Sequence, residues 1–380
     1  MRCRPVPRRR LIPVLLAPLV ALLCAWGATP ASARTQVGWV VTGHGFGHGV
    51  GMSAYGAAGY AEHGKGYKFI LAHYYQGTTL GTISGPNVVR VLLGTSSGDV
   101  TFTEATSACR VQLDPTRTYE AHRLGNALVL RTSAGKPLAR CGATLRAAGA
   151  GVVNIGGFGR YRGALETVVN ESGELNVVNA LAVNQYVKGV IPNESPPSWP
   201  MAELKAQAVA SRSFALTAGV GGDGFDLYSD TRSQVYKGLE SEYTTSDEAE
   251  EQTANQVLTY EGKIAETLFS ACSGGKTESM ENVFGTAVPY LVGVPDPYDG
   301  ACPLHEWTLE FTGPEISEKL AGLLDGRLKK VVITKTGYSP RIIEAKLYGT
   351  GGVTTVTGEQ LEVALDGYST WMTFQKVVSG

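Results

Sequence analysis

The sequence has few of the features that mark repetitive or membrane-embedded proteins. It contains no fixed-period repeat and no low-complexity tract, and its apolar content is that of a globular chain. Its one long apolar run lies at the N-terminus and is shorter than the roughly 20 residues that a membrane-spanning helix requires. We therefore expect a globular protein without a stable membrane span once that segment is removed.

Residues 1–33 are typical of a secretory signal peptide. Five arginines precede an apolar run from Leu11 to Trp26, and an Ala-x-Ala cleavage site follows at 31–33. Leu23 precedes Cys24 where a lipidated cysteine would follow a small residue, so no lipid anchor is expected. The mature chain is predicted to be secreted.

Positive charge is not in excess. Removal of residues 1–33 leaves 28 basic and 34 acidic residues, a net charge of −6. A nucleic-acid-binding protein normally carries the opposite sign or at least one basic cluster, and the mature sequence has neither. Nucleic acid is therefore not expected as a partner.

Cysteine is scarce, and four cysteines remain after the predicted cleavage: Cys109, Cys141, Cys272 and Cys302. An even number in an oxidising compartment favours two disulfides. Four cysteines allow three pairings, and we favour Cys109 with Cys141 and Cys272 with Cys302 because neighbours in sequence close the shorter loops.

The pattern of residues predicts an α+β fold. Short β-branched runs broken by Gly, Asn, Asp or Ser predict a β-rich segment over 86–180. An alanine-rich helix is expected over 200–217, capped by Ser198, and a shorter one from Ser246. Two more helices are expected between the C-terminal strands, at 314–324 and 358–365. Strands and helices do not alternate regularly, which argues against a doubly wound fold.

Glu194 is the strongest candidate for an acid. It lies between Pro192 and the pair Pro196 and Pro197, so we expect a stiff loop leading into the alanine-rich helix. Its apolar neighbours, Trp199 among them, favour a raised pKa of the carboxyl. The alternative is a surface glutamate in a proline turn.

Two further pairs of polar residues follow Glu194. Lys205 and Arg212 are seven residues apart, so they share one helix face and predict a cationic stripe; the alternative is that both are merely solvated. Gln234 and Tyr236 are two apart on a strand-like run, which places them on the same face.

The stretch GHGFGHGVGMSAYGA, residues 43–57, is rich in glycine and histidine. His44 and His48 have a helical metal-ligand spacing, but the intervening glycines forbid a stable helix and no acid is nearby. The stretch lacks the Gly-Lys-Ser/Thr of a phosphate loop. We therefore predict neither metal nor cofactor here, and interpret the glycines as positions of positive φ and close backbone approach.

Several long motifs together resemble the SpoIID/LytB family of sporulation proteins and amidase enhancers, which act on bacterial peptidoglycan. These motifs are VNALAVNQYVKGVIPNESPPSWPMAELKAQAVASRSFAL, SDTRSQVYKG, FSACSGGKTESMENVFG and GHGVGMSAYGAAGYAEHGKGYKFILAHYYQGTTL. The last block usually lies near the C-terminus of the family, so its N-terminal place here is similar to a circular permutation. Ala54 and Ser195 stand where the family commonly has glutamine and methionine.

The resemblance implies a domain organisation. The Gly/His-rich permuted block would cover 34–82, and the SpoIID/LytB-like domain 83–376, with the β-rich segment 86–180 and a core at 181–302. This fold would be a mixed β-rich domain with a central alanine-rich helix and a glycan-binding groove, in a protein that is secreted and associated with the cell wall.

The resemblance also implies lytic transglycosylase activity on peptidoglycan glycan strands, with Glu194 as acid and then base. Only one well-placed carboxylate is found, which suits a reaction in which the muramyl 6-hydroxyl attacks internally. The alternative is a non-catalytic enhancer that binds wall glycan and stimulates a separate amidase. The residues expected to bind substrate are Lys205, Arg212, Gln207, Gln234, Tyr236, His48, Ser53 and Tyr55.

Overall fold

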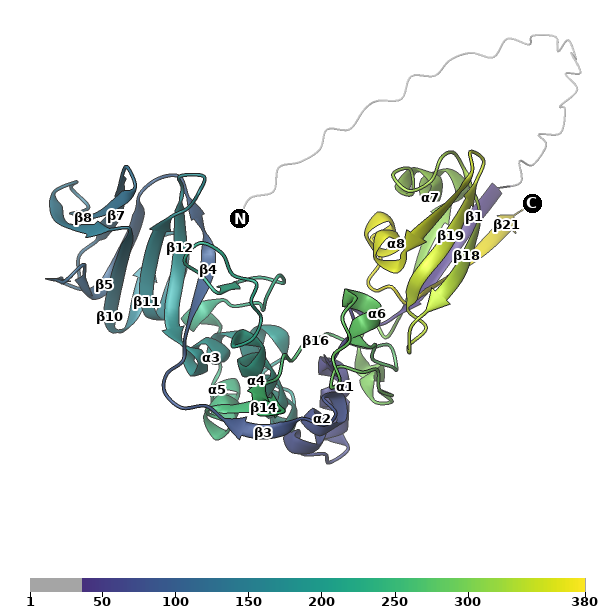
Figure 1. The fold of residues 1–380 in the computed structure, drawn as a ribbon, viewed down its shortest axis with the longest axis horizontal. Helices are drawn as coiled ribbons and strands as arrows, with labels where there is room; N and C mark the ends of the chain where they lie inside the picture. The colour runs from purple at the N-terminus through teal and green to yellow at the C-terminus, as the bar shows by residue number, and fades with distance from the viewer. Residues whose placement is uncertain (1–35, 380) are drawn as a thin grey trace, which may run out of the picture.

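The structure is a computed structural model that describes residues 36–379, so the predicted signal peptide lies outside the described residues. Figure 1 shows a β-rich lobe at one end, a smaller mixed lobe at the other, and a group of helices between them. The expected α+β class is confirmed, because helices and strands occur in separate runs. No helix within 36–379 has the length and apolar character needed to cross a membrane.

The β-rich lobe is one ten-stranded sheet that confirms the β-rich segment predicted for 86–180. Its strand order is β13-β4-β12-β11-β10-β5-β7-β8-β9, with β6 paired to β5, and all pairings except that of β13 are antiparallel. The disulfide Cys109–Cys141 has formed as predicted and joins the segments after β5 and in β9. The strands are β4 (Val88–Ser96), β5 (Val100–Ala108), β6 (Val111–Gln112), β7 (Tyr119–Leu124), β8 (Ala127–Thr132), β9 (Pro137–Gly142), β10 (Thr144–Ile155), β11 (Gly159–Val169), β12 (Leu175–Ala182) and β13 (Leu227–Tyr228).

The middle of the molecule is built around α4 (Met201–Ala215), the predicted alanine-rich helix. Its small side chains allow close approach, and nearly every residue from Leu204 to Ala215 is buried. Pro200, not Ser198, is the N-cap residue. The helices and strands that surround α4 are α1 (Ala54–Glu62), α2 (Tyr67–Tyr74), α3 (Val183–Glu194), α5 (Thr244–Gln252), β3 (Thr79–Thr82), β14 (Gln256–Tyr260) and β15 (Lys263–Ile264).

Two local expectations in this region are wrong. Ser246 does not cap α5: the helix begins at Thr244, and the Ser246 hydroxyl donates to the Tyr243 carbonyl from inside the first turn. The expected stiff loop before α4 is helical as far as Glu194, because α3 continues through Pro192. Burial of Val183, Val187 and Val190 at helical spacing outweighs the donor that the proline lacks.

The smaller lobe combines both ends of the described chain. Strand β1 (Gln36–His44) lies between β17 (Glu306–Thr312) and β21 (Met372–Ser379), antiparallel to both, so the purple and yellow strands of Figure 1 run side by side. The two helices predicted here are present, and both carry capping boxes. The remaining elements are α7 (Gly313–Lys319), β18 (Leu328–Thr336), β19 (Ile342–Gly349), β20 (Val353–Thr357) and α8 (Gly358–Leu365).

The junction between the smaller lobe and the helices is made of short elements. Strand β2 (Met52–Ser53) pairs in parallel with β16 (Phe269–Ser270), and α6 (Met280–Phe284) follows nearby. The disulfide Cys272–Cys302, also as predicted, crosses this junction. The Gly/His-rich stretch runs through it, which brings that stretch towards α3.

Candidate functional site

A pocket of about 560 Å³ lies where the Gly/His-rich stretch meets the C-terminal end of α3. Glu194 lines it together with three short segments, residues 46–48, 231–233 and 268–271. His48 and Glu194 therefore share one pocket.

The Glu194 carboxyl is half-buried, and its surroundings favour the protonated form. Burial raises its pKa, while a hydrogen bond from the Val235 amide to Oε1, at 2.7 Å, opposes part of this rise. No other hydrogen bond to this carboxyl occurs among the described residues. One oxygen is thus held in place, and the pKa of the group is shifted in the direction that suits a general acid.

Glu266 is a second carboxyl that lines the same pocket, and sequence reasoning missed it. Burial raises its pKa as well. It follows β15 in a segment without a distinctive motif, so only the fold brings it near Glu194. The sequence indicated only one well-placed acid, but the pocket holds two carboxyl groups.

His48 enters the pocket as a neutral ring. The Val50 amide donates to His48 Nδ1 at 3.0 Å, which leaves the ring proton on Nε2. Burial, aided by the nearby Arg341 guanidinium, lowers the pKa of His48 to about 4. A backbone hydrogen bond to Phe269 opposes part of this lowering, and at neutral pH the side chain carries no charge.

The glycines around His48 adopt positive φ and allow close packing of the backbone, as predicted. Gly49 and Gly51 both have a positive φ of 74°. A Cβ on Gly49 would lie 2.4 Å from the Arg341 guanidinium carbon, and one on Gly51 only 2.0 Å from the Leu268 carbonyl oxygen. Only glycine fits the close approach of this stretch to the pocket wall.

Ser53 and Tyr55 are placed differently from each other. Ser53 is fully buried and caps α1 by accepting a hydrogen bond from the Gly56 amide. Contrary to expectation, it does not line the pocket. The Tyr55 ring packs edge-on against Trp199, with ring centroids 4.8 Å apart. Tyr55 thus joins the Gly/His-rich stretch to the segment between Glu194 and α4.

The predicted cationic stripe on α4 is wrong. Arg212 is 0% exposed, and its guanidinium donates to Glu250 and Asn184, both at 2.8 Å. Helix α5 and β14 cover this end of α4, so the face that Lys205 and Arg212 share does not reach the solvent along its length. Lys205 is half-buried and lies 6.0 Å from the centre of the Tyr67 ring.

Gln207, Gln234 and Tyr236 are buried as well, and none lines the pocket. The Tyr186 hydroxyl of α3 donates to Gln234 at 3.0 Å, and Tyr236 donates to Asn179 of β12 at 2.7 Å. The run 231–237 is a loop rather than the expected strand. We assign Gln234 and Tyr236 to holding α3 against α4 and the sheet, where they position Glu194, whereas Gln207 donates to Ser211 within α4.

Replacement of Arg212 by methionine should destabilise the fold by about 3 kcal/mol, because it leaves the buried Glu250 carboxylate without its partner. The double variant Arg212→Met/Glu250→Gln should recover most of that loss. Urea unfolding measures both, and Lys205→Met, which breaks no buried pair, serves as control. A stable Arg212→Met protein that had lost glycan binding would restore the ligand role first expected of Arg212.

Comparison with known proteins finds relatives that match the segment of the chain containing this site. Residues 171–260, which include Glu194 and all of α4, match the model of the SpoIID family, described as stage II sporulation protein. An uncharacterized protein of Brachyspira hyodysenteriae is 44% identical over 148 residues, 38% of this chain and 40% of that protein.

Two relatives come from Bacillus subtilis. The amidase enhancer is 38% identical over 133 residues, 35% of this chain and 18% of that protein. Stage II sporulation protein D is 33% identical over 180 residues, 43% of this chain and 52% of that protein. The matched segments thus span about half or less of the relatives' length. Through the region around Glu194 and α4, the chain is therefore similar to the SpoIID family.

Proposed function

We propose that the protein remodels peptidoglycan outside the cell by a lytic transglycosylase-like cleavage of glycan strands. The observation that carries this proposal is the half-buried Glu194 carboxyl, with its raised pKa, in a pocket beside a neutral His48. The two disulfides suit an extracellular location. Similarity to sporulation and amidase-enhancer proteins supports a role at the cell wall.

In the proposed reaction Glu194 first donates its proton to the glycosidic oxygen as the bond to the anomeric carbon breaks. The 6-hydroxyl oxygen of the same muramyl residue then forms a new bond to that carbon. Its proton passes to the Glu194 carboxylate, which returns the acid to its starting state. The products are a 1,6-anhydro end and a free 4-hydroxyl, and no water is consumed.

Because Glu266 lines the same pocket, hydrolysis is the alternative reaction, and the same assay distinguishes it from transglycosylation. Two carboxyl groups flanking a glycosidic bond are the usual equipment of a hydrolase, in which water replaces the internal hydroxyl. Purified protein would be incubated with sacculi and with defined glycan strands, and the products identified by mass spectrometry. Anhydro ends support the proposal, whereas reducing ends alone would assign Glu194 and Glu266 to hydrolysis.

The second candidate function is that of a non-catalytic enhancer. Its specific support is the 38% identity to the amidase enhancer of Bacillus subtilis. In that case the pocket would bind glycan without cleaving it, and a separate amidase would be the partner. Protein that yields no new glycan ends alone, yet accelerates release of stem peptides by an added wall amidase, would favour the enhancer.

A further inference from the structure

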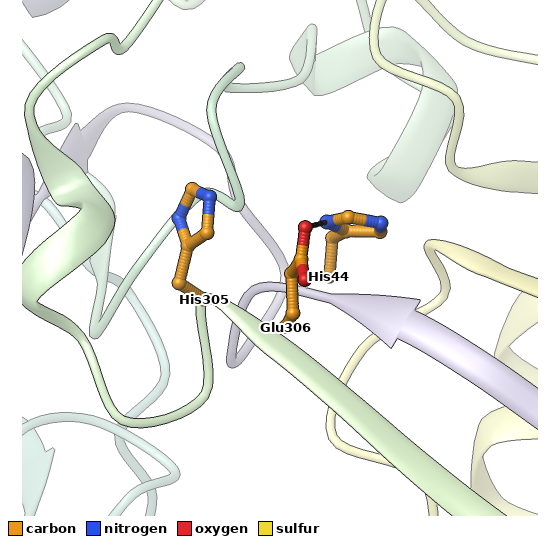
Figure 2. Close-up of side chains that lie close together, drawn as sticks. All are labelled: His44, His305 and Glu306. Atoms are coloured by element: carbon orange, nitrogen blue, oxygen red, sulfur yellow. Dashed lines mark ion pairs between the residues drawn. The ribbon is translucent and has the colours of Figure 1, made fainter.

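His44, His305 and Glu306 come together at the edge of the smaller lobe. His44 ends β1, Glu306 begins the neighbouring β17, and His305 directly precedes that strand. One potential ligand atom from each side chain lies within 4.8 Å of the others. Figure 2 shows the three side chains close together, and the His44 Nδ1 and Glu306 Oε1 atoms are 3.9 Å apart. The sequence reasoning had paired His44 with His48 and predicted no metal. Here His48 faces the pocket instead.

We propose that these three side chains form a binding site for a divalent transition-metal cation, with Zn²⁺ as the preferred ion. Two imidazoles and one carboxylate are a usual donor set for zinc, and they leave a fourth position for water or an anionic ligand. Ca²⁺ and Mg²⁺ prefer oxygen donors, so they should bind weakly if at all.

The backbone around the proposed site is fixed by hydrogen bonds. His44 and Glu306 stand directly opposite each other in the β1–β17 pair. The His44 amide donates to the Trp371 carbonyl at 3.0 Å, and the Gly45 amide donates to the His305 carbonyl at 3.1 Å. The Trp371 ring lies against the His44 imidazole, with centroids 5.0 Å apart. Binding would therefore require little ordering of the main chain.

The buried Asp299 carboxylate lies beside the His305 ring, an arrangement that is common where a histidine binds a metal. Asp299 Oδ1 lies 2.9 Å from His305 Nδ1, although the angle is outside hydrogen-bond geometry. A rotation of the ring that lets Nδ1 donate to Asp299 would leave Nε2 for a metal. Asp299 is itself held through Oδ2, which accepts from the Ser273 hydroxyl at 3.0 Å and the Gly274 amide at 2.7 Å. The disulfide Cys272–Cys302 closes the same turn.

Only the side chains must move for coordination. Ligand atoms around a tetrahedral zinc ion are separated by about 3.3 Å, given bonds of about 2.0 Å. The present separations of up to 4.8 Å are therefore too wide by about 1.5 Å at most. Glu306 is 69% exposed and can rotate towards the two rings. An occupied site would tie β17 to the end of β1, two residues before Phe46 enters the pocket wall.

The test measures metal binding directly and does not depend on catalysis. The mature protein would be treated with a chelator, dialysed and titrated with Zn²⁺ by calorimetry, with metal content by mass spectrometry. We expect one ion per chain and a rise in unfolding temperature. Glu306→Gln, which changes an exposed side chain, should weaken binding at least tenfold, and His44→Ala with His305→Ala should abolish it. Co²⁺ should bind with the visible absorption of a tetrahedral complex.

His122→Ala is the matched control, because His122 lies in the β-rich lobe beside Asp99 and should leave zinc binding unchanged. Folding of each variant would be verified by circular dichroism. A wild-type protein that takes up no zinc, or a folded Glu306→Gln protein that binds it as tightly as wild type, would overturn the proposal.

Discussion

Replacement of Glu194 by glutamine should reduce the release of anhydro-ended glycan from purified sacculi by about 100-fold or more, the range expected on loss of a general acid. The amide preserves shape and can still accept the Val235 hydrogen bond, so the protein should stay folded. What it loses is the proton that the half-buried carboxyl delivers.

The pH dependence of the same reaction gives a second readout. Because burial raises the pKa of Glu194, its acid form persists to higher pH than that of an ordinary glutamate. Activity that needs the acid form should therefore fall as pH rises through that raised pKa. Mass analysis of products across a pH series measures this limb.

Two matched variants sharpen the assignment. Glu266→Gln changes the other pocket carboxyl, and Glu251→Gln changes an exposed glutamate on α5 that pairs with Lys188. We expect Glu251→Gln to be neutral and Glu266→Gln to have a smaller effect than Glu194→Gln. Undiminished anhydro release by Glu194→Gln would remove it from the reaction, and loss with Glu266→Gln alone would transfer the acid role there.

Replacement of Glu203 by glutamine should make the protein's stability much less sensitive to a rise in pH from about 4.3 to about 8. Glu203 is fully buried in the first turn of α4, and burial raises its pKa to about 8. The Ser195 hydroxyl, next to Glu194 in sequence, donates to Glu203 Oε1 at 2.6 Å. In the unfolded chain the same carboxyl would titrate near 4.3.

The sign follows from this order of the two pKa values. The folded chain binds the Glu203 proton more tightly than the unfolded chain does. This difference stabilises the fold fully at pH values below the pKa of the unfolded chain. That contribution is lost as pH rises from about 4.3 to about 8, and it amounts to about 4 kcal/mol by pH 8. Glutamine cannot ionise, so the variant should keep its stability over this window.

Urea unfolding at pH 5 and pH 8 measures the effect as a difference between variant and wild type. Asp296, whose pKa burial raises to about 6, titrates in both proteins and cancels in that difference. His48, with its lowered pKa, contributes only on the acid side and cancels as well. Equal pH dependence in the two proteins would show that the Glu203 carboxyl is solvated.

Local patterns predicted the features whose causes are local. Alanine content and flanking residues were enough to place α4 within a few residues, and short loop closure was enough to pair the cysteines. The resemblance pointed to the SpoIID family because two of its motifs lie in the contiguous stretch around Glu194 that the family model matches.

Long-range packing decided the rest. Pro192 argues for a loop, yet α3 forms because its apolar face is buried. Helical spacing placed Arg212 beside Lys205, but only the position of α5 shows that Glu250 meets it. Glu266 and His305 are far from Glu194 and His44 in sequence, so no local pattern could bring either pair together.

The position of β1 between β17 and β21 has a consequence for how the protein folds. The first strand of the described chain can pair only after residues near the C-terminal end of that chain are available. Gly38, for example, pairs with both Thr312 and Val377. Contacts of such high sequence separation form slowly, because the entropy of closing the long loop is lost before the contacts are gained. The β-rich lobe, whose strands mostly pair with near neighbours, should fold first, and the smaller lobe should close last.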